Sequence, residues 1–281
     1  MAEHPIAVIT GTTHGIGTVT SWELARAGYT VVMLCRNIAA AQSLAQEIIR
    51  GIPGSRVEVV RCDLADLSSV RVAARTVAQR FAHIDRLINN AGIVSTRHRF
   101  SADGHELTFA TNHLGPYLLT RLLLPTLAPA ARIINVASKV HYRGRMDLGS
   151  IDDRAARYSS VAAYSRSKLA NVMDTLILAG QLAGSSVSVN CLHPGVVATN
   201  LLPGWLNLVR PLFKRHILSA ERGARSTLYL ALQPQAARLN GEYLDEHQRV
   251  QPTAPAARDR SLQQALLAWS ARWTGLDQAG A

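Results

Sequence analysis

A tyrosine and a lysine that stand four residues apart are the first candidates for chemistry. Tyr164 and Lys168 lie in a stretch with helical spacing of apolar residues. Residues i and i+4 of a helix share one face, so both side chains point the same way. A phenol has a pKa of about 10, and a nearby ammonium lowers it. The pair predicts a proton-exchanging tyrosine, although such pairs also occur by chance on helix surfaces.

A serine at the end of an apolar run strengthens that prediction. Ser138 directly follows residues 133–137, which read as a buried strand. Open α/β sheets bind ligands at the carboxyl ends of their strands, and a hydroxyl placed there can hold a substrate oxygen. The alternative is a serine that caps a helix or a turn.

A glycine-rich turn comes between the first predicted strand and the helix that follows it. Residues 10–17 read TGTTHGIG, with glycines at Gly11, Gly15 and Gly17. Glycines allow a tight turn that a pyrophosphate can approach closely, and the helix start offers N–H groups and a positive dipole end. The spacing is not GxGxxG, so an ordinary tight turn is the alternative, but its position favours a dinucleotide site.

The end of the second predicted strand distinguishes the two nicotinamide cofactors. An acidic residue about 20 positions after the glycine turn binds the ribose 2′-hydroxyl of NAD. Here the strand ends in Arg36 and Asn37, with neither Asp nor Glu. Arg36 can pair with a 2′-phosphate, and His14 could add a second positive group. We therefore expect NADP(H) rather than NAD(H); the alternative is that Arg36 is a solvated loop residue.

The elements that must position these residues alternate between short apolar runs and longer helical patterns. The predicted strands are Ala7–Thr10, Thr30–Cys35, Val57–Arg61, Arg86–Asn89, Arg132–Ala137, Val187–Leu192 and Glu242–Leu244. The predicted helices are Gly15–Ala27, Ala39–Arg50, Leu67–Phe81, Glu106–Leu127, Val161–Leu182 and Ala220–Leu232. Strands that are apolar throughout and alternate with helices are typical of a buried parallel sheet. The expected fold is a three-layer α/β/α Rossmann fold with a doubly wound parallel sheet.

The pattern predicts one domain over residues 1–250, interrupted by the segment 200–218. Residues 251–281 are expected to form a linker, Gln251–Pro255, and an amphipathic helix, Ser261–Trp273.

Composition narrows the class of protein. Apolar residues make up 48% of the 281 residues and charged residues 17%, which indicates a globular chain. The formal charge is +11, but the basic residues are scattered. Their densest cluster, Arg143, Arg145, Arg154 and Arg157, has no interleaved aromatics, so we do not expect a nucleic-acid partner.

The cysteines and the apolar runs bear on location. Cys35, Cys62 and Cys191 are far apart and form no CxxC pair, which argues against a disulfide framework or a metal site. No apolar run reaches 18 residues, and residues 1–10 do not read as a signal peptide. We therefore expect a cytoplasmic protein.

Several motifs occur together in the order seen in short-chain dehydrogenases/reductases, and the chain resembles this family from residue 5 to about 245. The motifs are the glycine turn, Asn89-Asn90-Ala91-Gly92, Asn112, Ser138, the pair Tyr164 and Lys168, and His193-Pro194-Gly195. The stretches 112–115, 167–171, 192–197 and 268–272 are similar to the retinol dehydrogenase branch. Two departures are Thr12-Thr13-His14 in the turn and Ala137, where a serine is common.

The resemblance implies roles for individual residues. Tyr164 would donate the proton in reduction and accept it in oxidation, and Lys168 would bind the nicotinamide ribose and lower the pKa of Tyr164. Ser138 would orient the carbonyl oxygen, and Asn112 would hold a water that relays protons to Lys168. The expected cofactor contacts are Gly11, Thr13, His14, Gly15, Ile16, Gly17, Arg36, Asp63, Leu64, Asn90, Gly92, Tyr164, Lys168, Pro194, Gly195, Val197 and Thr199.

Within that set, Asp63 would meet the adenine, Asn90 and Gly92 would line the cofactor floor, and residues 194–199 would hold the nicotinamide. The alternatives are a helix-capping Asp63, a loop Asn90 and a turn Pro-Gly.

The segment 200–218 corresponds by its family position to the substrate lid. An apolar stripe at helical spacing is formed by Trp205, Leu208, Val209, Leu212 and Phe213. The stripe favours an apolar substrate. It could instead pack on the sheet, or lie on a membrane surface, since the opposite face is basic.

These patterns predict an NADP(H)-dependent oxidoreductase of a small hydrophobic aldehyde, ketone or alcohol. One alternative is a non-catalytic, NADP(H)-binding regulatory protein of the same fold, against which the intact Ser138, Tyr164 and Lys168 speak. Another is a double-bond reductase resembling protochlorophyllide reductase, which calls for an active-site cysteine that is not found soon after Ser138. A homodimer is an expectation of the resemblance alone.

Overall fold

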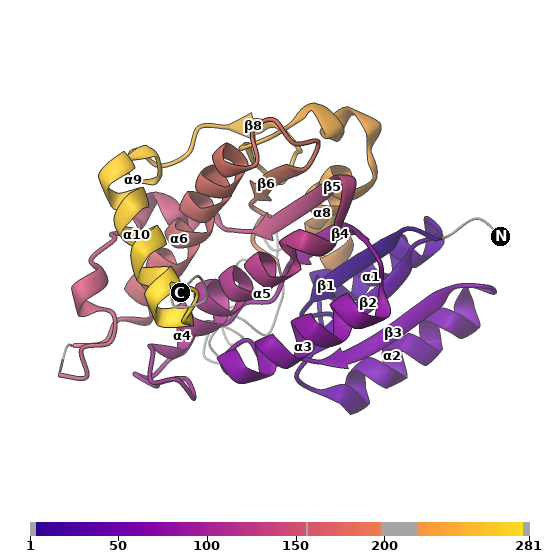
Figure 1. The fold of residues 1–281 in the computed structure, drawn as a ribbon, viewed down its shortest axis with the longest axis horizontal. Coiled ribbons are helices and arrows are strands. Elements are labelled where there is room, and N and C mark those ends of the chain that lie inside the picture. Colours follow the sequence, from indigo (N-terminus) through magenta and orange to yellow (C-terminus); the bar gives the residue numbers. More distant parts are fainter. Residues whose placement is uncertain (1–3, 156, 198–217, 278–281) are drawn as a thin grey trace.

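An eight-stranded sheet lies between two layers of helices (Figure 1). The computed structural model describes residues 4–155, 157–197 and 218–277. The strands are β1 (Ile6–Thr10), β2 (Thr30–Cys35), β3 (Arg56–Arg61), β4 (Ile84–Asn89), β5 (Leu127–Val136), β6 (Ser188–Leu192), β7 (Tyr243–Leu244) and β8 (Val250–Gln251). Their order is β3-β2-β1-β4-β5-β6-β7-β8, and only the last pair is antiparallel. The expected doubly wound parallel sheet is confirmed.

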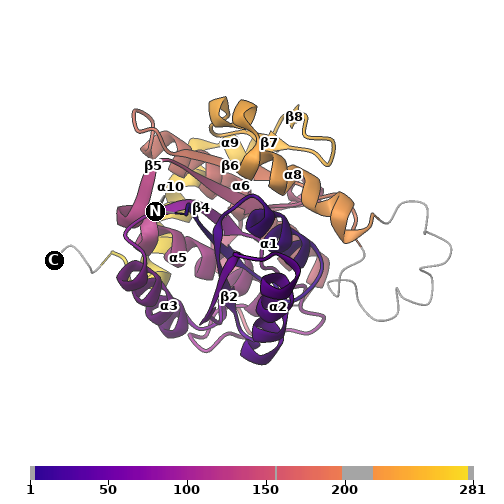
Figure 2. The same cartoon turned by 90° about the vertical axis from the view of Figure 1, so that its right-hand side faces the viewer.

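The helices cover both faces of the sheet. They are α1 (Ile16–Arg26), α2 (Ile38–Gly51), α3 (Leu67–Arg80), α4 (Leu107–Phe109), α5 (Gly115–Leu123), α6 (Ser160–Gln181), α8 (Ala220–Leu232), α9 (Pro255–Arg258) and α10 (Arg260–Thr274). Helices α1, α2 and α8 pack on one face and α3, α5 and α6 on the other, as Figure 2 shows edge-on.

Alternation along the strands builds the two cores. In β1, Val8 points into the core under α3 and α5, whereas Ala7 and Ile9 point into the core under α1, α2 and α8. Because successive strand residues face opposite sides, a strand buried on both sides must be apolar at every position.

The predicted helix Glu106–Leu127 needs one correction: residues 107–126 are helical without a break, but they are not α-helical throughout. It consists of α4, a π-helical turn at Ala110–Leu114, α5 and a short 3₁₀ turn at Leu124–Thr126. Pro125 has no N–H to donate to the preceding turn, so α5 ends before it, and Leu127 already belongs to β5.

The predicted linker Gln251–Pro255 is also wrong in part. Gln251 pairs with Tyr243 in the antiparallel β7–β8 ladder, and Pro255 begins α9. Two-residue strands carry too few residues to show a period of two, which is why the sequence pattern did not indicate β8.

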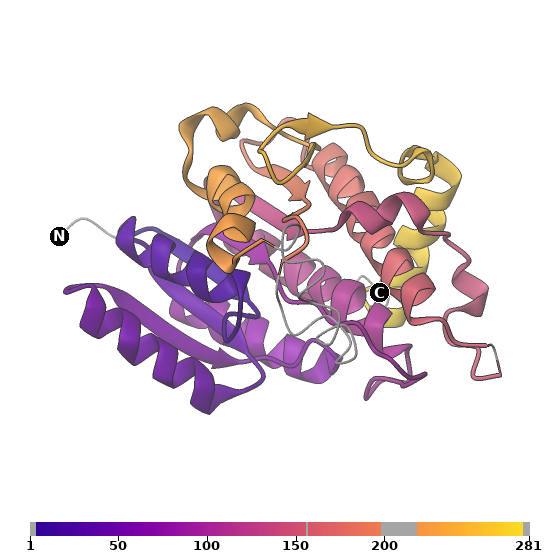
Figure 3. The ribbon, with the colours of Figure 1, turned by 180° about the vertical axis from the view of Figure 1, so that it is seen from behind.

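Helix α10 packs beside α6 and the π-helical turn, as Figure 1 and the view from behind in Figure 3 show. The Nε2 atom of His113 lies 2.8 Å from Ser270 Oγ, and the ring of Trp273 meets that of Phe109 edge-on. None of the described helices is long and apolar enough to cross a membrane.

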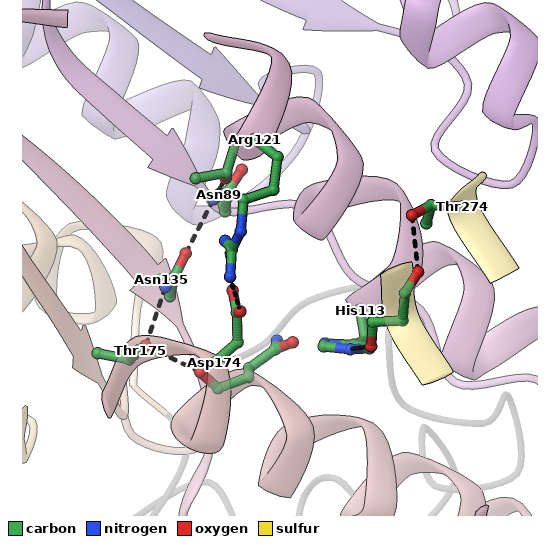
Figure 4. A network of polar contacts seen from close by, with 10 residues as sticks. Asn89, His113, Arg121, Asn135, Asp174, Thr175 and Thr274 are labelled. Carbon is green, nitrogen blue, oxygen red and sulfur yellow. Dashed lines mark hydrogen bonds and ion pairs between the residues drawn. The ribbon is translucent and has the colours of Figure 1, made fainter. Parts of the chain in front are cut away.

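Buried polar side chains tie the central strands to the helices of one face (Figure 4). The Asn89 amide on β4 donates to Asn135 Oδ1 on β5 at 2.8 Å, and the Asn135 amide donates to Thr175 Oγ1 on α6 at 2.9 Å. Close by, Arg121 and Asp174 form an ion pair at 2.6 Å that joins α5 to α6. These contacts hold α6, which carries the tyrosine and the lysine, in one register on the sheet.

The burial of His113 makes stability depend on pH. Desolvation lowers the pKa of this histidine from 6.5 to about 4, with Asp174 opposing that shift and Arg121 adding to it. In the unfolded chain, His113 binds a proton below about pH 6.5. In the folded chain it binds that proton only below about pH 4. The free energy of unfolding therefore falls over this window, by about 3 kcal/mol from this residue.

We expect His113→Gln, whose amide can keep the Ser270 contact, to lose that part of the decline. Urea unfolding of both proteins at pH 7.5 and 4.5 measures the difference. His247→Gln, at an exposed position, is the matched control. An equal loss of stability in wild type and His113→Gln would contradict the prediction.

Candidate active site

The candidate residues meet at one edge of the sheet. The glycine turn follows β1, Asn90 follows β4, Ser138 comes two residues after β5 and His193 follows β6. These strands are parallel neighbours in the order β1-β4-β5-β6, so their carboxyl ends lie side by side. The edge is the one at which open α/β sheets bind ligands.

The serine, tyrosine and lysine come together there. Helix α6 begins after Ser159, whose hydroxyl accepts a hydrogen bond from the Ala162 N–H and caps the helix. One turn later Tyr164 comes close enough to the Ser138 side chain for that side chain to affect the pKa of Tyr164. The Ser138 Oγ itself accepts from the Val140 N–H at 3.4 Å and caps the turn Lys139–Arg143. Lys168 is 3% exposed, and its ammonium donates to the carbonyl oxygen of Val136 at 2.7 Å and lies 5.7 Å from the Tyr164 ring centroid.

The charges in this site differ from the sequence prediction. Burial raises the pKa of Tyr164 above its usual value, and the nearby Ser138 side chain only partly offsets this. Burial also lowers the pKa of Lys168 to about 8. Desolvation thus dominates the pKa of Tyr164 in this structure, and the lowering of that pKa by Lys168 stays a prediction. At neutral pH the tyrosine is a protonated phenol beside an ammonium.

Asn112 occupies the π-helical turn and is fully buried. Its amide nitrogen donates to the Ile93 carbonyl at 2.9 Å and to Ser167 Oγ at 3.0 Å, while its oxygen accepts from the Ile93 N–H at 2.8 Å. Single π turns inside helices are frequent at functional sites. Asn112 thus joins the segment after β4 to α6, and its role in holding a water stays a prediction.

Gly92 lies between Asn112 and the lysine. A Cβ at Gly92 would stand 3.4 Å from the Lys168 ammonium and 3.5 Å from Asn112 Oδ1. Because Gly92 has no side chain, it leaves space beside the Lys168 ammonium and the Asn112 amide.

The glycine turn is shaped by its own packing. Gly11 has a φ of +71°, and a Cβ there would lie 2.8 Å from Ala91 Cα, while a Cβ at Gly17 would overlap the Gly11 carbonyl oxygen. The Asn90 amide donates to the carbonyls of Thr10 and Gly11 at 2.9 and 3.0 Å. Asn90 is therefore a loop residue whose side chain holds the glycine turn in place.

The turn fits the phosphates of a dinucleotide. Helix α1 begins at Ile16 after Gly15, and among the described side chains none caps its first turn. Free N–H groups at a helix start, approached over glycines, are a ready site for a pyrophosphate. Ile16 and Gly17 are buried beneath the turn, and Thr13 is partly exposed on it.

The basic residues expected at the 2′-phosphate lie at the surface. Thr12 Oγ1 contacts Cys35 Sγ at 2.8 Å, which sets the glycine turn against the end of β2. Arg36, the next residue, is exposed, and the described residues offer it no ion-pair partner. His14 is exposed too, with Nδ1 3.0 Å from Thr13 Oγ1.

The remaining predicted contacts line the same edge. Asp63 is not a helix cap: its carboxylate accepts from the Ala65 N–H, and Asp66 caps α3. Leu64 is buried, and its carbonyl oxygen would be overlapped by a Cβ at Gly115.

The stretch after β6 lies against the start of α1. Gly195 has a φ of +82°, and Val197 packs with Ile16 and Ala224. Thr199 and nearly all of the segment 200–218 lie outside the described residues. Leu218 is described, and its N–H donates to the Val196 carbonyl at 2.7 Å.

Two contacts that hold the site have no signal in the sequence. The Val136 carbonyl fixes Lys168, and Thr10 Oγ1 accepts from the N–H groups of Asn90 and Ala91 at 3.1 and 3.0 Å. A backbone carbonyl is the same in every residue, so no residue type could have indicated the first contact.

Comparisons with known proteins agree with this geometry. The family model of the short chain dehydrogenases matches residues 5–206. Human retinol dehydrogenase 13 is 37% identical over 280 residues, which cover 96% of this chain and 84% of that protein. Human retinol dehydrogenase 12 is 37% identical over 258 residues, with 90% and 81% covered.

Solved structures show the same fold. An uncharacterised protein from Mycobacterium paratuberculosis superposes with a TM-score of 0.79 at 37% identity, covering 98% of this chain and 94% of that one. A 3-ketoacyl-(acyl-carrier-protein) reductase from Brucella melitensis, complexed with NADH, has a TM-score of 0.68 at 28% identity, with 86% and 96% covered.

The chain belongs to the short-chain dehydrogenase family. It is an oxidoreductase that acts on alcohol or carbonyl groups with a nicotinamide cofactor, and it is similar to the retinol dehydrogenases.

The crowding at the glycine turn supplies a test. We expect Gly17→Ala to weaken NADPH binding at least tenfold, because the added methyl would overlap the Gly11 carbonyl oxygen and distort the glycine turn. Fluorescence titration with NADPH measures the binding.

Gly180→Ala is the matched control, since a Cβ at that helical position meets nothing within 4 Å. It should leave both binding and stability intact. NADPH binding by Gly17→Ala as tight as that of wild type would contradict the assignment of the turn.

Proposed function

We propose that the protein is an NADP(H)-dependent oxidoreductase whose substrate is a small hydrophobic aldehyde or ketone, or the corresponding alcohol. The observation that carries the proposal is the meeting of Ser138, Tyr164 and Lys168 at the carboxyl edge of the sheet. The remaining arguments concern the proton, the cofactor and the substrate.

The site residues handle the substrate oxygen and its proton. A bound nicotinamide supplies or accepts the hydride. The Ser138 and Tyr164 side chains lie close together and are placed to hold the same carbonyl oxygen. Because burial keeps Tyr164 protonated at neutral pH, its hydroxyl suits the donation of a proton to that oxygen in reduction. The Lys168 ammonium offsets the negative charge left on the phenol.

NADP(H) preference is supported by the end of β2. Neither Asp nor Glu follows that strand, so no carboxylate there would repel a 2′-phosphate. Arg36 is exposed next to the turn and can pair with the phosphate through two hydrogen bonds. Solved relatives hold NADH in one case and NADP in another, so the preference is argued from this chain's own residues.

A hydrophobic substrate is supported by the relatives named retinol dehydrogenases and by the apolar stripe in the segment 200–218. A cytoplasmic location and a homodimer stay predictions. Helix α10 covers part of α6 and the π-helical turn, so a dimer through these helices would have to include α10.

The first test removes the proposed proton donor. We expect Tyr164→Phe to lower kcat for carbonyl reduction by a factor of at least about 100, the usual contribution of a positioned acid, with NADPH affinity unchanged. Tyr29→Phe, a tyrosine at the opposite end of β2, is the control and should keep the wild-type rate. NADPH consumption with a panel of aliphatic and aromatic aldehydes and ketones is the measurement. If the wild type bound NADPH but reduced no member of the panel, the protein would be a binding protein instead.

The second test addresses the cofactor. We expect Arg36→Gln to raise the KM for NADPH about tenfold, the loss of one charge-assisted contact, and to leave the KM for NADH nearly unchanged. Arg50→Gln removes an exposed arginine at the far end of α2 and should change neither constant. An equal rise for both cofactors would show that Arg36 does not read the 2′-phosphate.

A further inference from the structure

A buried histidine three residues after Ser138 makes a contact with each of its ring nitrogens. His141 lies in the 3₁₀ turn Lys139–Arg143 and is 0% exposed. Its Nδ1 is 2.8 Å from the Ser138 carbonyl oxygen, and its Nε2 is 3.2 Å from the backbone nitrogen of Ala254.

The two partners determine the protonation of the ring. The Ala254 N–H can only donate, so Nε2 must be an unprotonated acceptor, and the Ser138 carbonyl can only accept, so Nδ1 must carry the proton. His141 is therefore neutral and in one tautomer. Burial lowers its pKa, which favours this state.

The groups that face His141 keep it in an apolar setting. The rings of Tyr142 and Tyr243 lie 4.1 and 4.6 Å from its own. His193 is a further titratable group near His141. Burial lowers its pKa most, and charges on Lys139 and His141 lower it further, while Glu246 and Asp245 raise it.

The contact with Ser138 bears on the catalytic hydroxyl. The Ser138 carbonyl accepts two hydrogen bonds from His141, one from the ring and one from the backbone N–H at 3.1 Å. Fixing that carbonyl fixes the backbone of Ser138, from which the side chain next to Tyr164 extends. The Ser138 Oγ accepts from the Val140 N–H at 3.4 Å, so the same turn also holds the side chain.

The other end of His141 rests on a fixed support. Ala254 stands between β8 and α9 and is 3% exposed, and the Tyr142 hydroxyl donates to the Pro252 carbonyl. The strand β8 is itself held to β7. The stretch 250–255 is thereby held to the sheet, so the Ala254 N–H can hold the ring of His141 in place.

We propose that His141 is a positioning residue that braces Ser138 against the stretch 252–254, so that this part of the chain after the parallel strands is needed for a productive active site. The inference rests on the proposed function. It assigns His141 no contact with substrate or cofactor.

The main experiment replaces the ring without emptying its space. His141→Phe keeps an aromatic ring but loses both nitrogens, and we expect kcat for the best carbonyl of the panel to fall at least tenfold. The affinity for NADPH should stay within twofold and the KM for the carbonyl within threefold. Tyr142→Phe removes the hydrogen bond to Pro252 but leaves His141 and the pairing of β8 with β7 intact, so its kcat should stay within twofold of wild type.

Two conservative variants test the contacts of the two His141 ring nitrogens separately. The amide nitrogen of His141→Asn reaches the place of Nδ1 and can donate to the Ser138 carbonyl, but the side chain does not reach Ala254. Its kcat should therefore lie above that of His141→Phe and below that of wild type. His141→Gln places its amide near Nε2, without a donor for Ser138, and should stay as slow as His141→Phe.

The acid side of the pH profile is a further readout. A proton added to Nε2 would face the Ala254 N–H and break this contact. Because burial holds the pKa of His141 below the usual value of about 6.5, wild-type kcat should decline only at a pH below that value. His141→Asn should lack this decline.

A measurement that needs no turnover tests the contact of His141 with Ser138 separately from the proposed function. Since the Ser138 side chain lowers the pKa of Tyr164, its displacement should raise that pKa. NMR titration of protein labelled at tyrosine Cζ, with the Tyr164 signal assigned from Tyr164→Phe, would show the rise in His141→Phe but not in Tyr142→Phe.

Different outcomes overturn different claims. If His141→Phe unfolds at a lower temperature but keeps the wild-type kcat and Tyr164 titration, His141 only stabilises the fold and the proposal is wrong. If the wild type reduces no carbonyl, the proposed function fails, and the titration alone decides whether His141 braces Ser138.

Discussion

The hydrogen bond from the Lys168 ammonium to the Val136 carbonyl is the constraint on which the site depends. It joins the middle of α6 to the last residue of β5, and it satisfies a charge that is almost fully buried. An unpaired ammonium at that depth would be strongly unfavourable. Because α6 is held at this point, Tyr164, one helical turn earlier, is held over the Ser138 hydroxyl.

Strand β5 and the first residues after it therefore contribute both main-chain and side-chain atoms to the site. The Val136 carbonyl holds the lysine, the Ser138 side chain meets the tyrosine, and the Ser138 carbonyl holds His141. Burial acts on all the titratable partners in the same direction: it favours the neutral forms of Tyr164 and His141 and brings the pKa of Lys168 close to neutrality. A charged ligand bound at this edge would therefore shift the pKa values of these groups.

The C-terminal part of the chain contacts the turns that carry residues of the candidate site. Residues 250–254 meet the turn that contains His141, and α10 meets the π-helical turn next to Asn112 through the contact of His113 with Ser270. Two buried, neutral histidines thus connect the end of the chain with residues of the candidate site. Both connections join segments more than 100 positions apart in the sequence.

The sequence by itself determined the layers, the parallel sheet and the family. These follow from local patterns: apolar strands, helical spacing, a glycine turn and residue types at the strand ends, each readable within about 20 residues. Only the tertiary structure decided how the long helix predicted over Glu106–Leu127 is divided, where β8 pairs, and in which direction burial moves the pKa of Tyr164. It also revealed the roles of His141, His113 and the Val136 carbonyl. The physical reason is that desolvation and hydrogen bonds to the main chain depend on which distant segments come together, and neither leaves a pattern of residue types along the chain.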